Sequence, residues 1–132
     1  MDKRIKMNKY ERVTLKAMLR INSKKETPEI AWENASSEVF GIGTSSQKKS
    51  CPKNSFLGLC DAGKVKGIEK GCCCIKTKSK NMDYVITAIN LINKDRSLLK
   101  DKMNLWREIT NIKYNQQLDV LFALIDKDYI RL

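Results

Sequence analysis

Apolar residues recur at spacings of three and four along most of the chain, which is the period of an amphipathic helix. Six such stripes are present. In chain order they are Tyr10, Val13, Ala17 and Ile21; Trp32, Ala35, Val39 and Phe40; Phe56, Leu57, Leu59 and Cys60; Val85, Ala88, Ile89 and Ile92; Leu105, Trp106, Ile109 and Ile112; and Leu118, Leu121, Phe122 and Ile125. With only two prolines and six glycines in 132 residues, the pattern predicts an all-α fold of six helices.

Polar residues and prolines predict where these helices begin. Thr27 supplies a side-chain cap, Pro28 suits the first helical position, and Gly41 suits the end of that helix. The other expected starts are Asn8, Ser50 or Cys51 with Pro52 in the first helical position, Asn81 and Asn115. We expect residues 1–8 to fray, residues 65–68 to form a short extended piece and residues 94–101 to form a linker or an early turn.

The two halves of the chain resemble each other. Three sets of positions match at offsets of 71, 74 and 65: Leu15, Ala17, Ile21 and Asn22 with Ile86, Ala88, Ile92 and Asn93; Ala31, Trp32, Ser36 and Phe40 with Leu105, Trp106, Thr110 and Tyr114; and Phe56, Leu57, Leu59, Cys60, Asp61 and Val65 with Leu121, Phe122, Leu124, Ile125, Asp126 and Ile130. We therefore expect two degenerate three-helix repeats, 8–68 and 81–132, joined by a basic connector, 69–80. Because so small a unit buries its apolar face poorly, the two should pack into one compact domain, 1–132.

The offsets also locate a difference between the halves. The offset falls from 74 to 65 between the second and third helices, so the first unit carries nine more residues there. These residues form the loop 41–49, which is rich in Gly, Ser and Thr and then basic. An insertion in one copy of a repeat is a common place for function to be added to a scaffold.

Charge points to the same region. The net charge is +11, and residues 41–80 hold nine basic but only two acidic residues. A clustered excess of positive charge attracts polyanions such as nucleic acid. The alternative is a solvated, lysine-rich surface with no ligand.

The loop and the helix start after it have the chemistry of a phosphate site. Glycines free backbone N–H groups, and a helix N-terminus adds positive potential and unpaired donors. The candidate residues are Gly43, Thr44, Ser45, Ser46, Gln47, Lys48, Lys49, Ser50, Lys53 and Asn54. The stretch is not a P-loop, because no Gly-Lys-Ser/Thr follows a strand. The alternative is a surface loop whose polar side chains only cap the third helix.

A helix–turn–helix reader that uses the third helix is a second possibility. However, no arginine occurs between residues 21 and 95, and base reading relies on arginine, asparagine and glutamine. Contact with phosphates that ignores base sequence is therefore the better expectation.

Catalytic and metal chemistry find little support. Histidine is absent, which excludes Cys–His and Ser–His dyads and every zinc site that uses histidine. The five cysteines, three of them adjacent at 72–74, lack a CxxC pair and do not form a disulfide framework. Cys51 lies beside lysines that would lower a thiol pKa, but it has no evident base. We expect no cofactor, no metal and no enzymatic activity.

Several segments of the chain resemble a known family. Trp32-Glu33-Asn34-Ala35, Phe40-Gly41, residues 43–54, Phe56-Leu57-Gly58-Leu59-Cys60 and Gly63 are similar to an uncharacterised bacterial family of small cytosolic helical proteins with a GTSSQKK-CPKN-FLGLC core motif. The resemblance covers most of the chain and implies no function. The run Cys72-Cys73-Cys74 departs from that pattern.

The leading hypothesis is a small basic protein that binds nucleic acid or another phosphate-bearing polyanion through residues 41–53. The alternative is an adaptor or inhibitor that binds an acidic protein partner. With no signal peptide and no long apolar run, we expect a cytoplasmic protein without a membrane partner, either a monomer or a homodimer.

Overall fold

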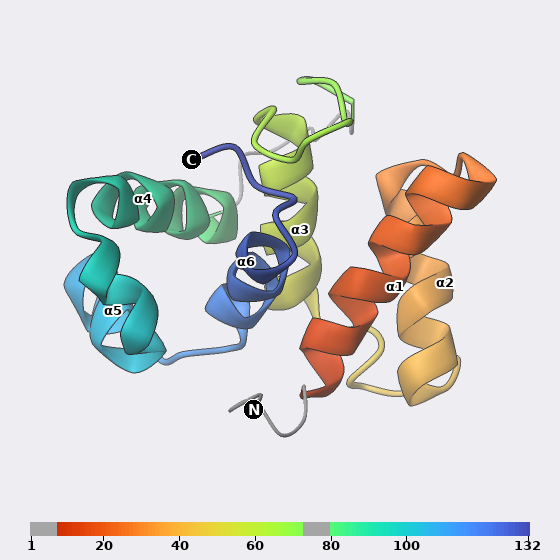
Figure 1. The fold of residues 1–132 in the computed structure, drawn as a ribbon. Helices are drawn as coiled ribbons and strands as arrows, with labels where there is room; N and C mark the ends of the chain where they lie inside the picture. The colour runs from red at the N-terminus through yellow and green to blue at the C-terminus, as the bar shows by residue number, and fades with distance from the viewer. Residues whose placement is uncertain (1–7, 73–79) are drawn as a thin grey trace, which may run out of the picture.

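Polar caps and apolar stripes place seven helical segments in the computed structural model, which describes residues 8–72 and 80–132 (Figure 1). The α-helices are α1 (Lys9–Lys24), α2 (Pro28–Phe40), α3 (Ser50–Asp61), α4 (Lys80–Lys94), α5 (Lys102–Ile109) and α6 (Gln117–Asp126), with a 3-10 helix η1 (Arg96–Lys100) before α5. The prediction of an all-helical fold with six α-helices is confirmed. The expectations for the first seven residues, for Cys73 and Cys74, and for residues 73–79 of the basic connector lie outside the described residues.

Two of the expected helix starts are confirmed. Asn8 caps α1 in a reciprocal capping box: its side chain accepts from the Glu11 N–H, and Glu11 accepts from the Asn8 N–H, each at 2.9 Å. Thr27 caps α2 with Pro28 in the first helical position, and Gly41 ends that helix with φ of 95°. Local sequence signals therefore set both ends of α2.

Three other starts differ from the prediction. The helix α3 begins at Ser50, so Pro52 occupies the third helical position, where an N–H would also lack an intrahelical partner. Asn81 lies inside α4, which already begins at Lys80. Asn115 is not the cap of α6; Gln116 precedes that helix with φ of 66° and no side-chain cap. Tertiary contacts, described below, hold the chain at the starts of α3 and α6.

The fifth helix is shorter than its apolar stripe. It ends at Ile109, and Ile112 is 53% exposed beyond it. The backbone turns away because the Trp106 indole donates to the Ile112 carbonyl at 2.7 Å and the Thr110 hydroxyl accepts from the Ile112 N–H. These local bonds replace the helical ladder in residues 110–116.

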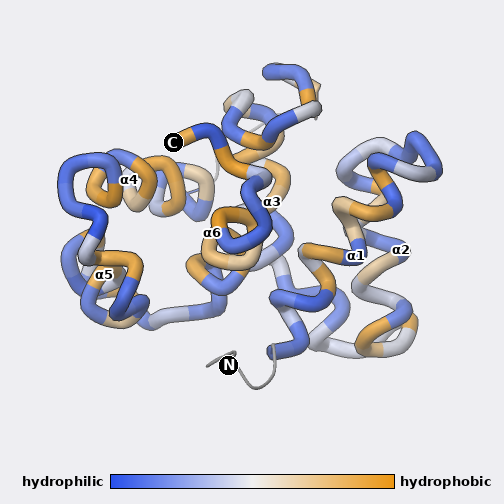
Figure 2. The backbone as a smooth tube through the Cα atoms, viewed as in Figure 1, coloured by the Kyte–Doolittle hydropathy of each residue, from blue (hydrophilic) through white to orange (hydrophobic). Residues whose placement is uncertain are grey.

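The core forms around α6, the most apolar helix. It lies in the centre of the molecule between α1, α3 and α4, and its tube is largely orange in Figure 2. The side chains of Leu118, Leu121 and Leu124 are fully buried. In the first half, Trp32 stacks on Phe56 with ring centroids 5.2 Å apart. Both tryptophans are 2% exposed, so they act as packing residues, as the sequence suggested.

Helices of the first half pack on helices of the second half. Helix α1 packs on α2 and on α6, whereas α3 packs on α4 and on α6. At the α3–α4 crossing, Gly58 lets the backbones approach closely: a Cβ on Gly58 would lie 2.7 Å from the Cβ of Met82. This position therefore accepts only glycine at the observed helix separation.

The ends of α3 and α6 have the same hydrogen bonds. At each end, one residue has a positive φ angle, Gly63 after α3 and Asp128 after α6. The backbone N–H of the next residue donates to a carbonyl in the last turns of the same helix. The matching bonds are Lys64 N–H to Leu59 and Tyr129 N–H to Leu124, Gly63 N–H to Cys60 and Asp128 N–H to Ile125, and Ala62 N–H to Gly58 and Lys127 N–H to Ala123.

The chains that leave these two helices then pair with each other. Val65 and Ile130 form an isolated antiparallel bridge, the one extended pairing among the described residues. The Lys66 N–H donates to Tyr129 at 2.7 Å, and the Arg131 N–H donates to Lys64 at 2.8 Å. The pairing is reciprocal, so a local two-fold axis passes between Val65 and Ile130.

Candidate functional site

The loop between α2 and α3 is shaped by glycine and threonine. Gly41 and Gly43 have φ of 95° and 82°, in the region that disfavours side chains. The Thr44 hydroxyl donates to the Gly41 carbonyl at 3.0 Å and accepts from the Gln47 N–H at 3.2 Å. Gly43 and Thr44 thus build the turn that presents the rest of the loop.

Gln47 anchors the loop to α2. It is 6% exposed, and its amide nitrogen donates to Ser36 at 3.1 Å and to Glu33 at 3.2 Å, while its amide oxygen accepts from the Gly43 N–H at 3.2 Å. Of the predicted site residues, Gln47 therefore points inward. It also engages the Glu33 carboxylate that lies behind the loop.

Lys49 fastens the start of α3 to two other helices. It occupies the N-cap position, and its ammonium group donates to the Gln116 side chain before α6. The same Nζ lies 5.6 Å from the centre of the Tyr10 ring on α1. Lys49 thus joins both halves of the chain, and Gln116 is a contact that sequence reasoning missed.

An aromatic pair borders the loop. Tyr10 at the start of α1 and Phe40 at the end of α2 are partly exposed, with ring centroids 4.9 Å apart and a 47° angle between the rings. The Tyr10 hydroxyl donates to the Ser46 carbonyl at 3.2 Å, and Lys9 Nζ lies 5.9 Å from the Phe40 ring centre. Both rings belonged to apolar stripes in the sequence, so their position beside the loop was not recognised.

The remaining predicted residues lie at the surface of the same junction. Ser45, Ser46, Lys48 and Ser50 are exposed, and Lys53 and Asn54 in the first two turns of α3 are half-exposed. The structure therefore brings the predicted loop residues together with the first turn of α1.

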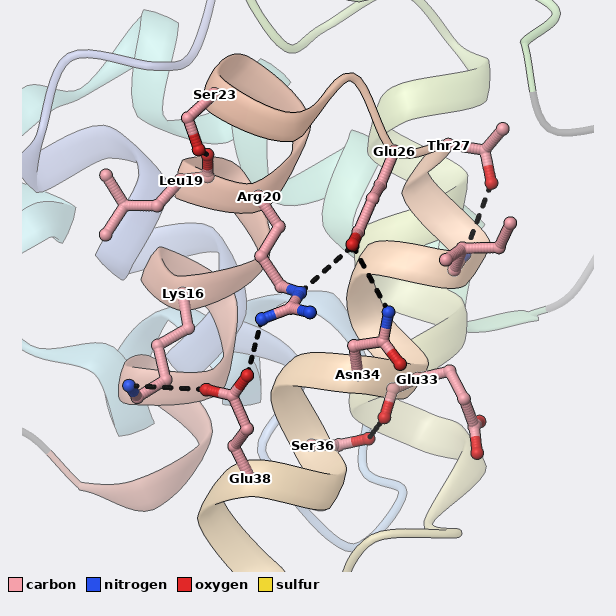
Figure 3. A network of polar contacts seen from close by, with 11 residues as sticks. Lys16, Leu19, Arg20, Ser23, Glu26, Thr27, Glu33, Asn34, Ser36 and Glu38 are labelled. Carbon is pink, nitrogen blue, oxygen red and sulfur yellow. Dashed lines mark hydrogen bonds and ion pairs between the residues drawn. The ribbon is translucent and has the colours of Figure 1, made fainter.

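Lysines at this junction differ from Lys16 and Arg20 in their partners, as do Arg12, Lys24, Lys25 and Lys64. Between α1 and α2, Arg20 pairs with Glu26 and Glu38, and Lys16 lies 3.6 Å from Glu38 (Figure 3). By contrast, Lys9, Lys48, Lys49 and Lys53 form no ion pair with any residue in 8–72 or 80–132. Among the described residues, no carboxylate oxygen lies within 4.0 Å of their ammonium groups.

Helix α3 has no free face for a DNA groove. Residues 55–60 are all buried, which is more than one full turn. A recognition helix must expose a face along its length to reach base edges. The burial of α3 argues against duplex reading by this helix.

A second polar cluster lies away from the loop and supports the fold. The Asp119 carboxylate is 4% exposed, pairs with the Lys102 ammonium and accepts a bond from the Tyr114 hydroxyl at 2.8 Å. Burial, and then the Asp119 charge, raise the pKa of the Tyr114 hydroxyl. Each charged or polar group here has a partner, which is typical of a structural network.

No described helix combines the length and apolar character that a bilayer crossing needs. Within residues 8–72 and 80–132, no three carboxylate or thiol side chains gather in a group able to hold a metal ion.

Comparison with known proteins gives the family. The chain matches the model of DUF6979, a family of unknown function, over residues 7–131, and it belongs to that family. Neither the curated proteins nor the solved structures that were searched contain a match to the chain. The resemblance to an uncharacterised family is thereby confirmed, and the function must be argued from the site.

Proposed function

We propose that this protein binds nucleic acid or another phosphate-bearing polyanion at the junction of the 41–49 loop, α1 and α3, without strong preference for sequence. One observation carries the proposal: Lys9, Lys48, Lys49 and Lys53 gather at this junction with no ion-pair partner among the described residues. Uncompensated lysines at a surface raise the local concentration of anions and contact phosphates directly.

The loop contributes in two ways. Its outer hydroxyls, those of Ser45, Ser46 and Ser50, are exposed and suit phosphate oxygens. The Thr44 hydroxyl holds the turn together, and the buried Gln47 side chain fixes the loop to Ser36 of α2, so that both hold the outer groups in place. We therefore assign Gln47 a supporting role and add Lys9 to the residues predicted from the sequence.

A fluorescence-anisotropy titration tests the proposal. A labelled 12-nucleotide strand is titrated at about 50 and 200 mM salt with wild type and with the triple variant Lys9→Ala/Lys48→Ala/Lys53→Ala. Lys49 is left intact because it holds α3 to Gln116 and Tyr10. Lys94→Ala/Lys100→Ala/Lys127→Ala, which removes the same charge from exposed lysines elsewhere, is the matched control.

The proposal expects salt-sensitive binding that the first variant weakens about tenfold or more and the control changes much less. Equal weakening by both variants would assign the affinity to overall charge instead of this junction. No binding at 50 mM salt would contradict the proposal.

An acidic protein partner is the second candidate, favoured by Ile42. This side chain is 86% exposed in the same loop, and an exposed apolar residue beside lysines suits a protein surface better than a sugar–phosphate backbone. If Ile42→Ser abolishes capture of an acidic protein while nucleic acid does not compete, this candidate replaces the first.

We also propose that the two helical units, 8–68 and 81–132, descend from a duplication. The identical hydrogen bonds at the ends of α3 and α6 and the reciprocal bridge between Val65 and Ile130 support it, since each bond maps onto its counterpart at the offset of 65. The caps Thr27 and Asp101 correspond at the offset of 74. On this view the 41–49 loop is the feature that distinguishes the first copy.

A further inference from the structure

The aromatic pair beside the loop adds a second kind of contact to the proposed site. We propose that Tyr10 and Phe40 form a stacking platform for unpaired bases, so that the polyanion bound here is single-stranded nucleic acid. This inference rests on the proposed function, because the lysines of the same junction hold the phosphates. It goes further by naming the ligand class and two residues that contact its bases.

The geometry places an ammonium group over each ring of the pair. The two partly exposed rings lie 4.9 Å apart, Lys9 Nζ is 5.9 Å from the Phe40 centre, and Lys49 Nζ is 5.6 Å from the Tyr10 centre. Proteins that bind single strands without sequence preference combine a basic surface with aromatic side chains on which bases stack. Stacking tolerates any base, since every base has a π-face.

The platform is held rigidly, which favours stacking. The Tyr10 hydroxyl is bonded to the Ser46 carbonyl, and the Asn8–Glu11 capping box fixes the first turn of α1, which carries Lys9 and Tyr10. Phe40 is the last residue of α2. Rings with a fixed position lose little conformational freedom when a base stacks on them.

Three buried aromatic residues are less suited. Trp32 and Trp106 are 2% exposed and Phe56 is fully buried, so none of these three offers a face to a base. Duplex DNA keeps its bases stacked on each other, and the buried face of α3 prevents that helix from entering a groove. Both observations favour a strand whose bases are free.

Three oligonucleotides test this inference with the wild-type protein. A 12-nucleotide oligothymidine strand, an abasic strand of the same length and charge, and a 12-base-pair duplex are titrated at about 50 mM salt. The abasic strand keeps the phosphates and removes the bases. We expect the oligothymidine strand to bind at least about tenfold more tightly than the abasic strand, as the loss of stacking predicts.

Variants then locate the stacking. Phe40→Leu and Tyr10→Leu should bring oligothymidine binding down to the level of the abasic strand, and circular dichroism checks that both variants remain folded. Tyr10→Phe keeps the ring and should retain tight binding. Tyr84→Leu changes a half-buried aromatic residue on α4, packed 5.1 Å from Trp106, and serves as the matched control with no expected effect.

The outcomes separate this inference from the function on which it rests. Equal binding of all three oligonucleotides would overturn the stacking platform but leave the polyanion site standing. Preference for bases that survives both leucine variants would overturn the role of Tyr10 and Phe40. Absence of binding to any of the three would overturn the platform together with the polyanion site.

Discussion

The close crossing of α3 and α4 gives the sharpest prediction for the fold. Gly58→Ala adds one methyl group to the middle of α3. In an exposed helix this change would stabilise the protein by about 1 kcal/mol, because alanine has the higher helix propensity. In this structure the new Cβ would lie 2.7 Å from the Cβ, 2.8 Å from the Cγ and 3.1 Å from the Cα of Met82.

The clash cannot be relieved by rotating a side chain. The Cα and Cβ of Met82 are fixed by the backbone of α4, and carbon atoms normally approach to about 3.5–4.0 Å. The two helices must therefore separate by several tenths of an ångström, and overpacking of this kind costs about 1–3 kcal/mol. After the gain in propensity, we expect a net loss of up to about 2 kcal/mol.

Urea denaturation followed by tryptophan fluorescence and by circular dichroism measures this loss, and the melting temperature should fall by roughly 4 °C per kcal/mol. The double variant Gly58→Ala/Met82→Gly removes the Cβ and Cγ contacts. Alanine at 58 should be less harmful in the Met82→Gly background than in wild type, which a double-mutant cycle reports directly. If Gly58→Ala instead stabilises the protein by about 1 kcal/mol, the crossing described here is wrong.

Three other predictions concern caps and the buried polar cluster. Thr27→Ala and Asp101→Ala each remove a side-chain cap, at 3.3 Å and 3.1 Å, and should each lower the free energy of unfolding by about 1 kcal/mol; unchanged urea midpoints would contradict the assigned caps. Lys102→Met leaves the buried Asp119 carboxylate without its cation and should cost about 3 kcal/mol; an unchanged midpoint in urea denaturation would refute the pairing. The pKa of the Tyr114 hydroxyl is raised in the folded state, so its contribution to stability is complete below the unfolded pKa of about 10 and is lost as the pH rises above that value. Above pH 10, the unfolding free energy of the wild type should therefore fall more steeply with pH than that of Tyr114→Phe, by up to about 1.4 kcal/mol per pH unit. Parallel slopes would contradict the raised pKa.

Much of the helical architecture could be predicted from local signals. Thr27, Pro28 and Gly41 fix α2 through contacts within a few residues of sequence, and Asn8 fixes the start of α1 in the same way. Such capping chemistry depends on neighbours in the chain, so it can be recognised without a structure.

The starts of α3 and α6 could not be predicted because distant residues determine them. Lys49 is held by Gln116 and by the Tyr10 ring, and these contacts set where α3 begins. Likewise, the bond from Trp106 to Ile112 ends the helical course that the apolar stripe suggested for α5. Asparagine often caps helices, yet the Asn115 N–H donates to the Gln117 side chain and Asn115 is not the cap of α6.

The composition of the sequence located the candidate site but did not indicate what each of its residues does. The loop and its lysines were visible in the sequence, whereas burial alone distinguishes Gln47, which anchors the loop, from Lys48, which is exposed. Tyr10 and Phe40 belong to apolar stripes and are separated by 30 residues, so only the packing of α1 on α2 brings their rings together.

The most direct test of the polyanion site is a two-dimensional ¹H–¹⁵N NMR titration of the wild-type protein with a 12-nucleotide oligothymidine strand. The site described here predicts that the largest shift changes fall on the amides of Lys9, Tyr10, residues 43–50 and Lys53, with small changes in α4, η1 and α5. Changes concentrated instead around Lys64, Lys66 and Lys70, or no changes at low salt, would contradict the assignment of polyanion binding to this junction.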